Sequence, residues 1–357
     1  MKKEEIVMTF PHLANYYVAF AFFVGNGLGV KCIVPPPISK KTIELGSKHA
    51  PDFVCSPFKI NLGNFIEAIE AGANMILQTN GGCRVGYYGE LQEQILKDLG
   101  YEFEFIKLPL NNKREMIKIY KEAKKKGIKT NVFKLGYYLL LTIKMIKKID
   151  VFEEYVRSNI GFEVVDGSFD LISKEFLTEL PNIRGFRGLR TTFKKYMKMV
   201  KAIPLKKPNN TLKVGVVGEL FTLMDGFSNH FLEKELAKYG VEITRYVTAD
   251  YLIFKSSQKA KKLLKDKNDY VQFDLGAGGT DSVVKSLDFA KNHYDGIIHV
   301  KASFCTPEIN AMPIMQRISA YYEIPILYFS FDTATSDIGV KTRIEAFYDM
   351  LEMRRNK

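Results

Sequence analysis

The side chains best suited to chemistry in this 357-residue sequence are four cysteine thiols, Cys32, Cys55, Cys83 and Cys305. Their spacing is too wide for a disulfide framework, and it lacks both the paired CxxC of a zinc ribbon and the close cysteine run of a ferredoxin. Such thiols are either small core residues or metal ligands that the fold gathers in a reducing compartment. The spacing alone leaves both interpretations open.

Cys83 and Cys305 stand at matching places in two similar stretches. ANMILQTNGGC (73–83) and DGIIHVKASFC (295–305) both run from a turn residue through an apolar strand to a cysteine, and a helix-like segment follows each. Parallel sheets bind ligands beyond the carboxyl ends of their strands, so both thiols are expected where an open α/β domain does its chemistry. Two such domains facing each other would aim both thiols into one cleft.

Cys55 lies in DFVCSPFKINLGNF, again at the end of an apolar run. The helix after it is expected to begin near Asn61 or Gly63. A loop thiol close to a helix N-terminus has its thiolate form favoured by the unpaired N–H groups, and here also by Lys59 or Arg84. Thiolates of this kind bind metals, which makes Cys55 a third candidate ligand.

The elements that would position these thiols alternate between strand and helix, which is typical of an α/β fold. Strands are predicted at residues 6–9, 30–34, 73–78, 101–108, 211–219, 241–248, 295–300 and 324–332. Helices are predicted at residues 16–24, 62–72, 89–100, 229–240, 281–294, 308–322 and 343–355. We therefore expect two Rossmann-like parallel-sheet domains, at 1–109 and 211–357, joined by a basic, mainly helical insertion or linker at 110–210.

The charge of the chain is strongly basic, with 52 Lys and Arg against 40 Asp and Glu and a formal net charge of +12. Such a balance suits an acidic partner or simply a solvated lysine-rich surface. We do not expect nucleic acid as the partner, because the lysines are mixed with acidic residues. No stretch has the length and composition of a signal peptide or a membrane span, so a cytoplasmic protein is expected.

Residues 54–103 and 295–351, with the motifs CSPFK, GGCRVGYY and FCTPE, resemble the 2-hydroxyacyl-CoA dehydratase D-component family. The resemblance is strongest to an uncharacterised branch of that family, associated with ATP-dependent activators of CoA enzymes. It implies that Cys55, Cys83 and Cys305 hold a [4Fe–4S] cluster as its metal ligands, whereas nothing comparable marks Cys32. Three thiolates would leave one iron open to a hydroxide, a small ligand or a substrate oxygen.

Four neighbouring residues acquire roles from the implied cluster. Gly81 and Gly82 would let backbone N–H groups approach its sulfides. Arg84 would offset the cluster's charge or lie on the surface as an ordinary arginine. Glu308 would orient a ligand, although we favour its alternative role as a cap of the following helix.

The resemblance implies an anaerobic iron–sulfur protein in electron transfer, either a low-potential reductase or a dehydratase-like component. Electrons would come from a separate ATP-dependent activator protein, and the substrate would be a small molecule or an acyl-CoA-like compound. Family relatives act as dimers of like subunits, so a homodimer is expected. Two other readings stay open: a metal-independent α/β module that binds a nucleotide or a CoA-like anion, and a cluster carrier without catalytic turnover.

Overall fold

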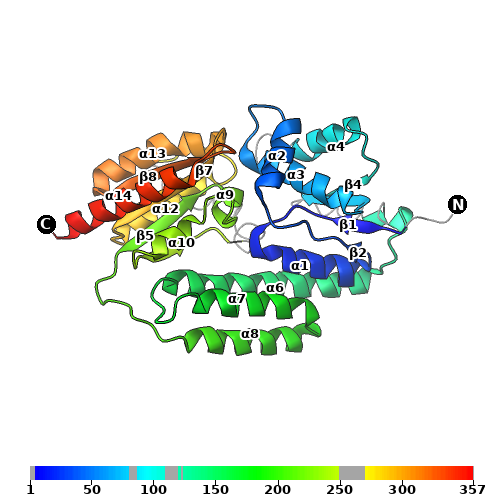
Figure 1. The fold of residues 1–357 in the computed structure, drawn as a ribbon, viewed down its shortest axis with the longest axis horizontal. Coiled ribbons are helices and arrows are strands. Elements are labelled where there is room, and N and C mark those ends of the chain that lie inside the picture. The colour runs from blue at the N-terminus through cyan, green and yellow to red at the C-terminus, as the bar shows by residue number, and fades with distance from the viewer. Residues whose placement is uncertain (1–4, 80–86, 109–119, 122–123, 249–269, 357) are drawn as a thin grey trace. The chain divides into compact units, whose positions relative to one another are not determined.

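The computed structural model describes residues 5–79, 87–108, 120–121, 124–248 and 270–356 (Figure 1). The chain divides into two compact units. The first comprises Met1–Ile146 and Leu180–Leu189, and the second comprises Lys147–Glu179 and Arg190–Lys357. Among the described helices, none is long and apolar enough to cross a membrane.

The first unit is built on a four-stranded parallel sheet in the order β2-β1-β3-β4. Its strands are β1 (Val7–Thr9), β2 (Lys31–Cys32), β3 (Met75–Thr79) and β4 (Glu104–Leu108). Its helical segments include η1 (Ala14–Tyr16), α1 (Tyr17–Phe22), η2 (Phe23–Leu28), α2 (Lys40–His49), α3 (Ser56–Glu70) and α4 (Tyr88–Asp98). Ile76 packs in the cluster of α3 and α4, whereas Met75 and Leu77 pack with η2. Because both faces are covered, β3 begins with a continuous apolar run at residues 75–77.

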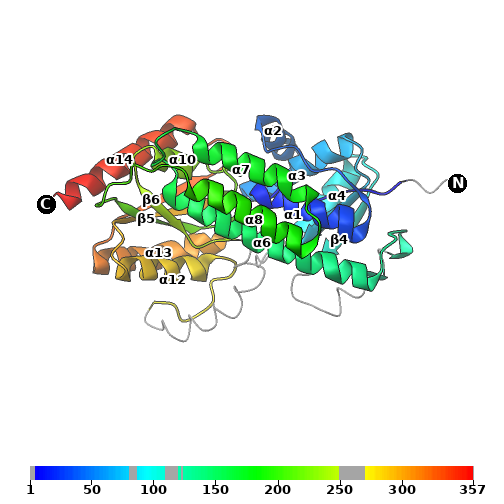
Figure 2. The same ribbon diagram turned by 90° about the horizontal axis from the view of Figure 1, so that it is seen from below.

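The second unit repeats this topology with a parallel sheet in the order β6-β5-β7-β8. Its strands are β5 (Lys213–Gly218), β6 (Glu242–Arg245), β7 (Gly296–Ala302) and β8 (Ile326–Phe331). Its helices include α9 (Leu220–Met224), α10 (Leu232–Ala237), α12 (Gly279–Lys291), α13 (Thr306–Tyr322) and α14 (Asp337–Arg355). Figure 2 shows α12 and α13 on one face of the sheet and α10 and α14 on the other.

Long helices lie in the sequence between β4, the last strand of the first sheet, and β5, the first strand of the second. They are α6 (Val132–Asn159), α7 (Ser168–Glu179) and α8 (Gly185–Lys201), with the short η3 (Leu180–Asn182) between the last two. In the second unit, the ring of Phe176 on α7 lies 4.4 Å from Phe152 on α6 and 5.5 Å from Tyr196 on α8, measured between centroids. These ring contacts hold the three helices together, and Figure 2 shows the helices side by side.

The two all-parallel sheets confirm the predicted α/β fold with two Rossmann-like domains. The two similar stretches at residues 73–83 and 295–305 contain matching strands, because β3 and β7 hold the same place in their sheets. The division of the chain into domains at 1–109, 110–210 and 211–357 stays a prediction. Two details of the predicted helices were wrong. Helix α2 was not predicted, and α3 begins at Ser56, before the expected start near Asn61 or Gly63.

Helices α2 and α3 cross in unusually close contact because each has a glycine at the crossing. A Cβ atom on Gly46 would lie 1.7 Å from the carbonyl oxygen of Lys59, and one on Gly63 would lie 1.9 Å from that of Thr42. The Thr42 hydroxyl also donates a hydrogen bond of 2.7 Å to Glu67 on α3. The crossing fixes the start of α3, and with it the position of Cys55.

A buried ion cluster ties α6 to the sheet of the second unit. Glu233 on α10 pairs with Arg157 on α6 and with Arg245 at the end of β6, at 3.0 Å in both cases. The arginine side chains are only 7% and 4% exposed. Burial raises the pKa of Glu233, but the two guanidinium groups outweigh it and hold that pKa below its ordinary value of 4.5.

Replacing Glu233 with Gln should destabilise the folded chain by about 2 kcal/mol at neutral pH, because two buried guanidinium groups lose their nearer shared carboxylate and keep only that of Glu153, at 3.8 and 3.9 Å. Since the folded pKa is lowered, the ionised carboxylate contributes stability above pH 4.5, and that contribution is lost as the pH falls through the folded pKa. The difference between wild type and variant, measured by urea unfolding, should therefore shrink in acid.

Glu235→Gln is the matched control, because Glu235 lies on the same helix and pairs with Lys238, whose side chain is 63% exposed. Exposed pairs of this kind contribute about 0–1 kcal/mol. Equal small losses in the two variants would show that the Glu233 cluster contributes no more than a surface pair.

Candidate functional site

The candidate site residues lie beyond the carboxyl ends of the strands in each sheet. In each sheet the chain order reverses between two central strands, β1 and β3 in the first unit and β5 and β7 in the second. Ligands bind open α/β sheets in the crevice outside such a switch point. The chain leaves β7 at Ala302 and reaches Cys305 three residues later, so this thiol lies at the switch point of the second unit.

Cys55 occupies the N-cap of α3 in an extended backbone conformation, with φ −67° and ψ 156°. Its side chain makes no capping hydrogen bond to the helix, and its Sγ lies 2.6 Å from the hydroxyl of Tyr88. The Tyr88 ring is held against Phe58 in an edge contact at 5.1 Å. A hydroxyl donating to sulfur favours the thiolate, as does the positive end of the helix dipole.

Cys305 occupies the N-cap of α13 in the same way, with φ −73° and ψ 91° and without a capping hydrogen bond from its side chain. In both helices a hydroxyl residue follows the cysteine and a proline comes second: Ser56 with Pro57, and Thr306 with Pro307. Proline is tolerated there because its missing N–H has no partner within the helix anyway. The two units thus share a local Cys-Ser/Thr-Pro cap at a helix of more than four turns.

The backbone before Cys305 is strained into position. Phe304 has a left-handed conformation with φ 67°, which is uncommon for a bulky residue. Cys305 N–H donates to the carbonyl oxygen of Ala302 at 3.1 Å, which closes the turn from β7 into α13. Strain of this kind is found where the surrounding structure holds a side chain in a particular place.

Several predicted site residues lie outside the described part of the chain. These are Cys83, the two glycines before it and the arginine after it: Gly81, Gly82, Cys83 and Arg84. Their assignment as ligand and neighbours stays a prediction. Lys59 was expected to favour the Cys55 thiolate. Its ammonium group donates a hydrogen bond to the carbonyl oxygen of Asp52, in the loop that leads to Cys55.

Cys32 differs from the other two described cysteines. It lies within β2, beside Met8 of β1, and packs against the core on the η2 side of the sheet. Burial raises the pKa of its thiol to about 11, so the thiol stays protonated at neutral pH. A metal needs the thiolate, so these surroundings disfavour Cys32 as a ligand, and its place outside the cluster stays a prediction.

Glu308 does not cap α13, contrary to the role that the sequence favoured. Its side chain is 1% exposed and accepts a hydrogen bond of 3.2 Å from the hydroxyl of Ser282 on α12. Its other oxygen lies 2.8 Å from Nε2 of His299 on β7. Glu308 therefore ties the first turn of α13 to the strand and to α12. His299 is fully buried.

Glu219 lies at the end of β5, next to this buried group. Its carboxylate caps α9 by accepting hydrogen bonds from the N–H groups of Phe221 and Thr222, at 2.8 and 2.9 Å. Burial raises the pKa of Glu219, those hydrogen bonds lower it, and the nearby Glu308 carboxylate raises it further, so the pKa lies above its ordinary value. Two carboxyl groups thus come together at the switch point of the second unit.

The donor atoms fit a cluster ligand set only in part. Soft thiol groups at helix N-termini are the chemistry that iron prefers, and Cys55 and Cys305 both supply it. Within the described residues, however, no three His, Cys, Asp or Glu side chains gather closely enough to hold a metal ion. The third expected ligand, Cys83, lies outside those residues.

Fold and loops together define an α/β protein with two Rossmann-like sheets and thiols at the N-termini of the helices beside them. Residues 285–351 match the family model described as 2-hydroxyglutaryl-CoA dehydratase, D-component, so the predicted resemblance is confirmed over that segment. The segment runs from α12 through β7, Cys305, α13 and β8 into α14. No curated protein sequence matches the chain.

Proposed function

We propose that this protein is an iron–sulfur component of 2-hydroxyacyl-CoA dehydratase type, working as a low-potential reductase or dehydratase-like partner in electron transfer. Cys55, Cys83 and Cys305 are its cluster ligands in this proposal. The observation that carries it is the match of residues 285–351 to the dehydratase D-component, because the matched segment contains Cys305 at the start of α13.

The local geometry of the thiols supports the proposal independently of that match. Cys55 and Cys305 share one backbone setting in two different units, although the helices that they cap hold different places in the topology. Packing in a core does not require two cysteines to occupy N-cap positions that are each followed by a hydroxyl residue and a proline. A shared ligand chemistry gives such a reason, since both sulfurs face the N-terminal end of a helix dipole.

A cluster held by three thiolates would supply an electron and an open iron site. The residues of this chain would hold and tune it. The Tyr88 hydroxyl, 2.6 Å from Cys55 Sγ, would donate a hydrogen bond to the ligand sulfur. The Glu308–His299 contact would hold the first turn of α13, and therefore Cys305, against β7.

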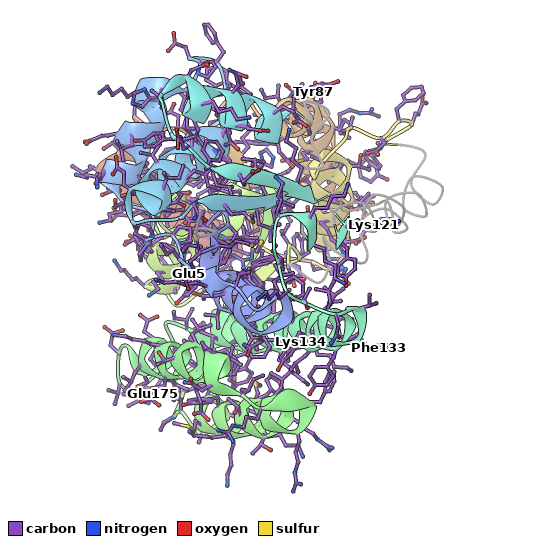
Figure 3. The ribbon with its side chains drawn as sticks, turned by 90° about the vertical axis from the view of Figure 1, so that its right-hand side faces the viewer. Glu5, Tyr87, Lys121, Phe133, Lys134 and Glu175 are labelled. Atoms are coloured by element: carbon purple, nitrogen blue, oxygen red, sulfur yellow. The ribbon has the colours of Figure 1, made fainter. Side chains whose placement is uncertain are left out.

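A cluster held by all three thiols needs Cys55, Cys83 and Cys305 to lie close together, which we include in the proposal. Exposed aromatic side chains lie near Cys55 and near Cys305, and exposed apolar groups of this kind favour a covered surface at each thiol. Phe53, two residues before Cys55, is 82% exposed, and Phe304, directly before Cys305, is 52% exposed. Tyr87, which precedes α4 in the first unit, is 73% exposed (Figure 3).

The partners in this proposal follow from the same family. A separate ATP-dependent activator would deliver the electron in a reducing, anaerobic cytoplasm, and the substrate would be a small molecule or an acyl-CoA-like compound. The chain would work as a homodimer. The basic middle of the chain, roughly residues 110–207, would dock an acidic activator or a second copy of the chain in this scheme, because its charge would steer association.

Reconstitution of the wild-type chain with iron and sulfide under anaerobic, reducing conditions tests the proposal. We expect a brown protein with about four iron and four sulfide per chain, the stoichiometry of one cubane cluster. Metal analysis and visible absorption measure both. A protein that stays colourless and holds only background iron would overturn the cluster and favour an α/β module that binds a nucleotide or a CoA-like anion.

A further inference from the structure

The outward face of α6 carries exposed apolar side chains near the start of the helix. Phe133 is 89% exposed and Leu140 is 59% exposed, and Tyr137 between them is also exposed. Because these three residues recur at spacings of four and three, they lie along one face of the helix. Met145, on the opposite side of α6, is fully buried. Figure 3 shows Phe133 and Lys134 at the start of this helix.

A second segment of the first unit extends this apolar face. Phe186, at the start of α8, is exposed, and its ring lies 5.4 Å from that of Tyr137. Tyr137 also contacts Tyr138 at 5.2 Å, and Tyr138 in turn contacts Phe22 of α1 at 5.8 Å, all measured between ring centroids. These contacts hold the exposed rings against the first unit. The α6 patch, as we name it, consists of Phe133, Tyr137, Leu140 and Phe186.

The chain around the α6 patch is strongly basic. Residues 124–149 contain eight lysines and no Asp or Glu, and residues 180–189 contain two arginines and no Asp or Glu. Lys134 and Lys144 flank the patch along α6, and both are exposed. Neither forms a salt bridge within the described part of the chain. The α6 patch therefore combines exposed apolar groups with positive charge that its own segments do not offset.

The charge decides what covers the α6 patch. A second copy of the chain, seated patch to patch, would bring these lysines against one another, and like charges repel. Partner proteins in general are met by surfaces depleted in lysine. An anionic bilayer, in contrast, attracts lysine, whose long stem carries the charge to the headgroups while neighbouring aromatic and aliphatic groups enter the bilayer interface.

We propose that the α6 patch binds the surface of a membrane that contains anionic lipids. Lys134 and Lys144 would lie at the lipid headgroups, and Phe133 and Leu140 would insert between them. The chain would bind one leaflet from outside and dissociate when salt screens the lysines. This binding needs no metal cluster, so it is independent of the proposed function.

Co-sedimentation of the full-length chain with lipid vesicles tests the proposal. One set of vesicles contains phosphatidylcholine alone, and the other contains about one third phosphatidylglycerol, which makes the surface anionic. At low salt the chain should sediment with the anionic vesicles and stay in solution with the neutral ones. High salt should release it, because the attraction between lysines and headgroups is screened.

Two variants locate the binding surface. Phe133→Ser should lower the vesicle partition coefficient about tenfold, because one inserted ring is lost. Lys134→Gln combined with Lys144→Gln should lower it about thirtyfold, since each lysine near an anionic surface contributes about 1 kcal/mol. All three side chains are exposed, so both proteins should stay folded, which circular dichroism checks.

Matched controls remove the same groups elsewhere in the chain. Phe273→Ser removes a phenylalanine that is 77% exposed and is followed by Asp274. Lys234→Gln combined with Lys238→Gln removes two lysines of α10 that each pair with a carboxylate. Both control proteins should bind the anionic vesicles as the wild type does.

Three results would overturn the proposal. Absence of binding to the anionic vesicles would leave an acidic protein as the partner of the α6 patch. Equal binding to both kinds of vesicle, or equal losses in the controls, would show that neither the charge nor the patch directs binding. A chain that sediments as a dimer without lipid, and as a monomer after Phe133→Ser, would show that a second copy covers the patch.

Discussion

Ser in place of Cys55, Cys83 or Cys305 is expected to leave the chain folded and to remove most of its iron after reconstitution. Serine nearly preserves the side-chain volume but replaces a soft sulfur ligand with a hard, weakly acidic hydroxyl. Wild type should hold about four iron per chain, and each variant clearly less than half of that, because a cubane with two protein thiolates is easily lost. Iron and sulfide analysis under anaerobic conditions measures the difference.

Cys32→Ser is the control, since Cys32 packs in the core and burial raises its pKa to about 11. It should keep full iron. Cys55 and Cys305 are only partly buried, so the Ser variants should differ from wild type by no more than about 1 kcal/mol in unfolding free energy. Full iron in all three ligand variants would falsify the assignment of the thiols.

Gly63→Ala should be the most destabilising of the substitutions considered for the first unit. The new methyl group would lie 1.9 Å from the carbonyl oxygen of Thr42, and backbone atoms cannot move aside without separating α2 from α3. We expect a loss of about 3 kcal/mol or more, which exceeds the gain of about 1 kcal/mol that alanine brings to a helix interior. Thermal or chemical unfolding followed by circular dichroism measures it.

Gly136→Ala should change the free energy of unfolding in the opposite direction in the same assay. Gly136 lies inside α6, and a Cβ atom there would meet nothing within 4 Å. Only helix propensity should change, so this variant should be stabilised by about 0.5–1 kcal/mol. Similar effects from both glycines would contradict the close helix crossing.

The fold was predictable from the sequence because its strands are unusually clear. Residues such as Ile297 and Ile298 belong to an apolar run that is buried on both faces of a parallel sheet, and such a run stands out from the lysine-rich helices. Helix α2 was missed because its capping Ser39 bonds with Thr42, not with the Glu or Gln that usually indicates a capping box.

Of the candidate site, the sequence indicated where two of the thiols lie, and their assignment as ligands stays a prediction. Cys55 and Cys305 could be found because cysteine is rare in this chain and each follows an apolar run. The role of Glu308 was predicted wrongly, because its buried partners Ser282 and His299 are 26 and 9 residues away along the chain. The repeated Cys-Ser/Thr-Pro sequence was a usable signal that pointed to the shared cap.

The prolines two positions after Cys55 and Cys305 bear on the kinetics of the proposed electron transfer. Pro57 and Pro307 each fix one backbone dihedral in the first turn of a helix and are themselves buried. Loops anchored in this way change shape little when the charge of a bound group changes. In the proposed function the reorganisation energy for gaining or losing one electron would therefore be small, and transfer from an activator could be fast even with a modest driving force.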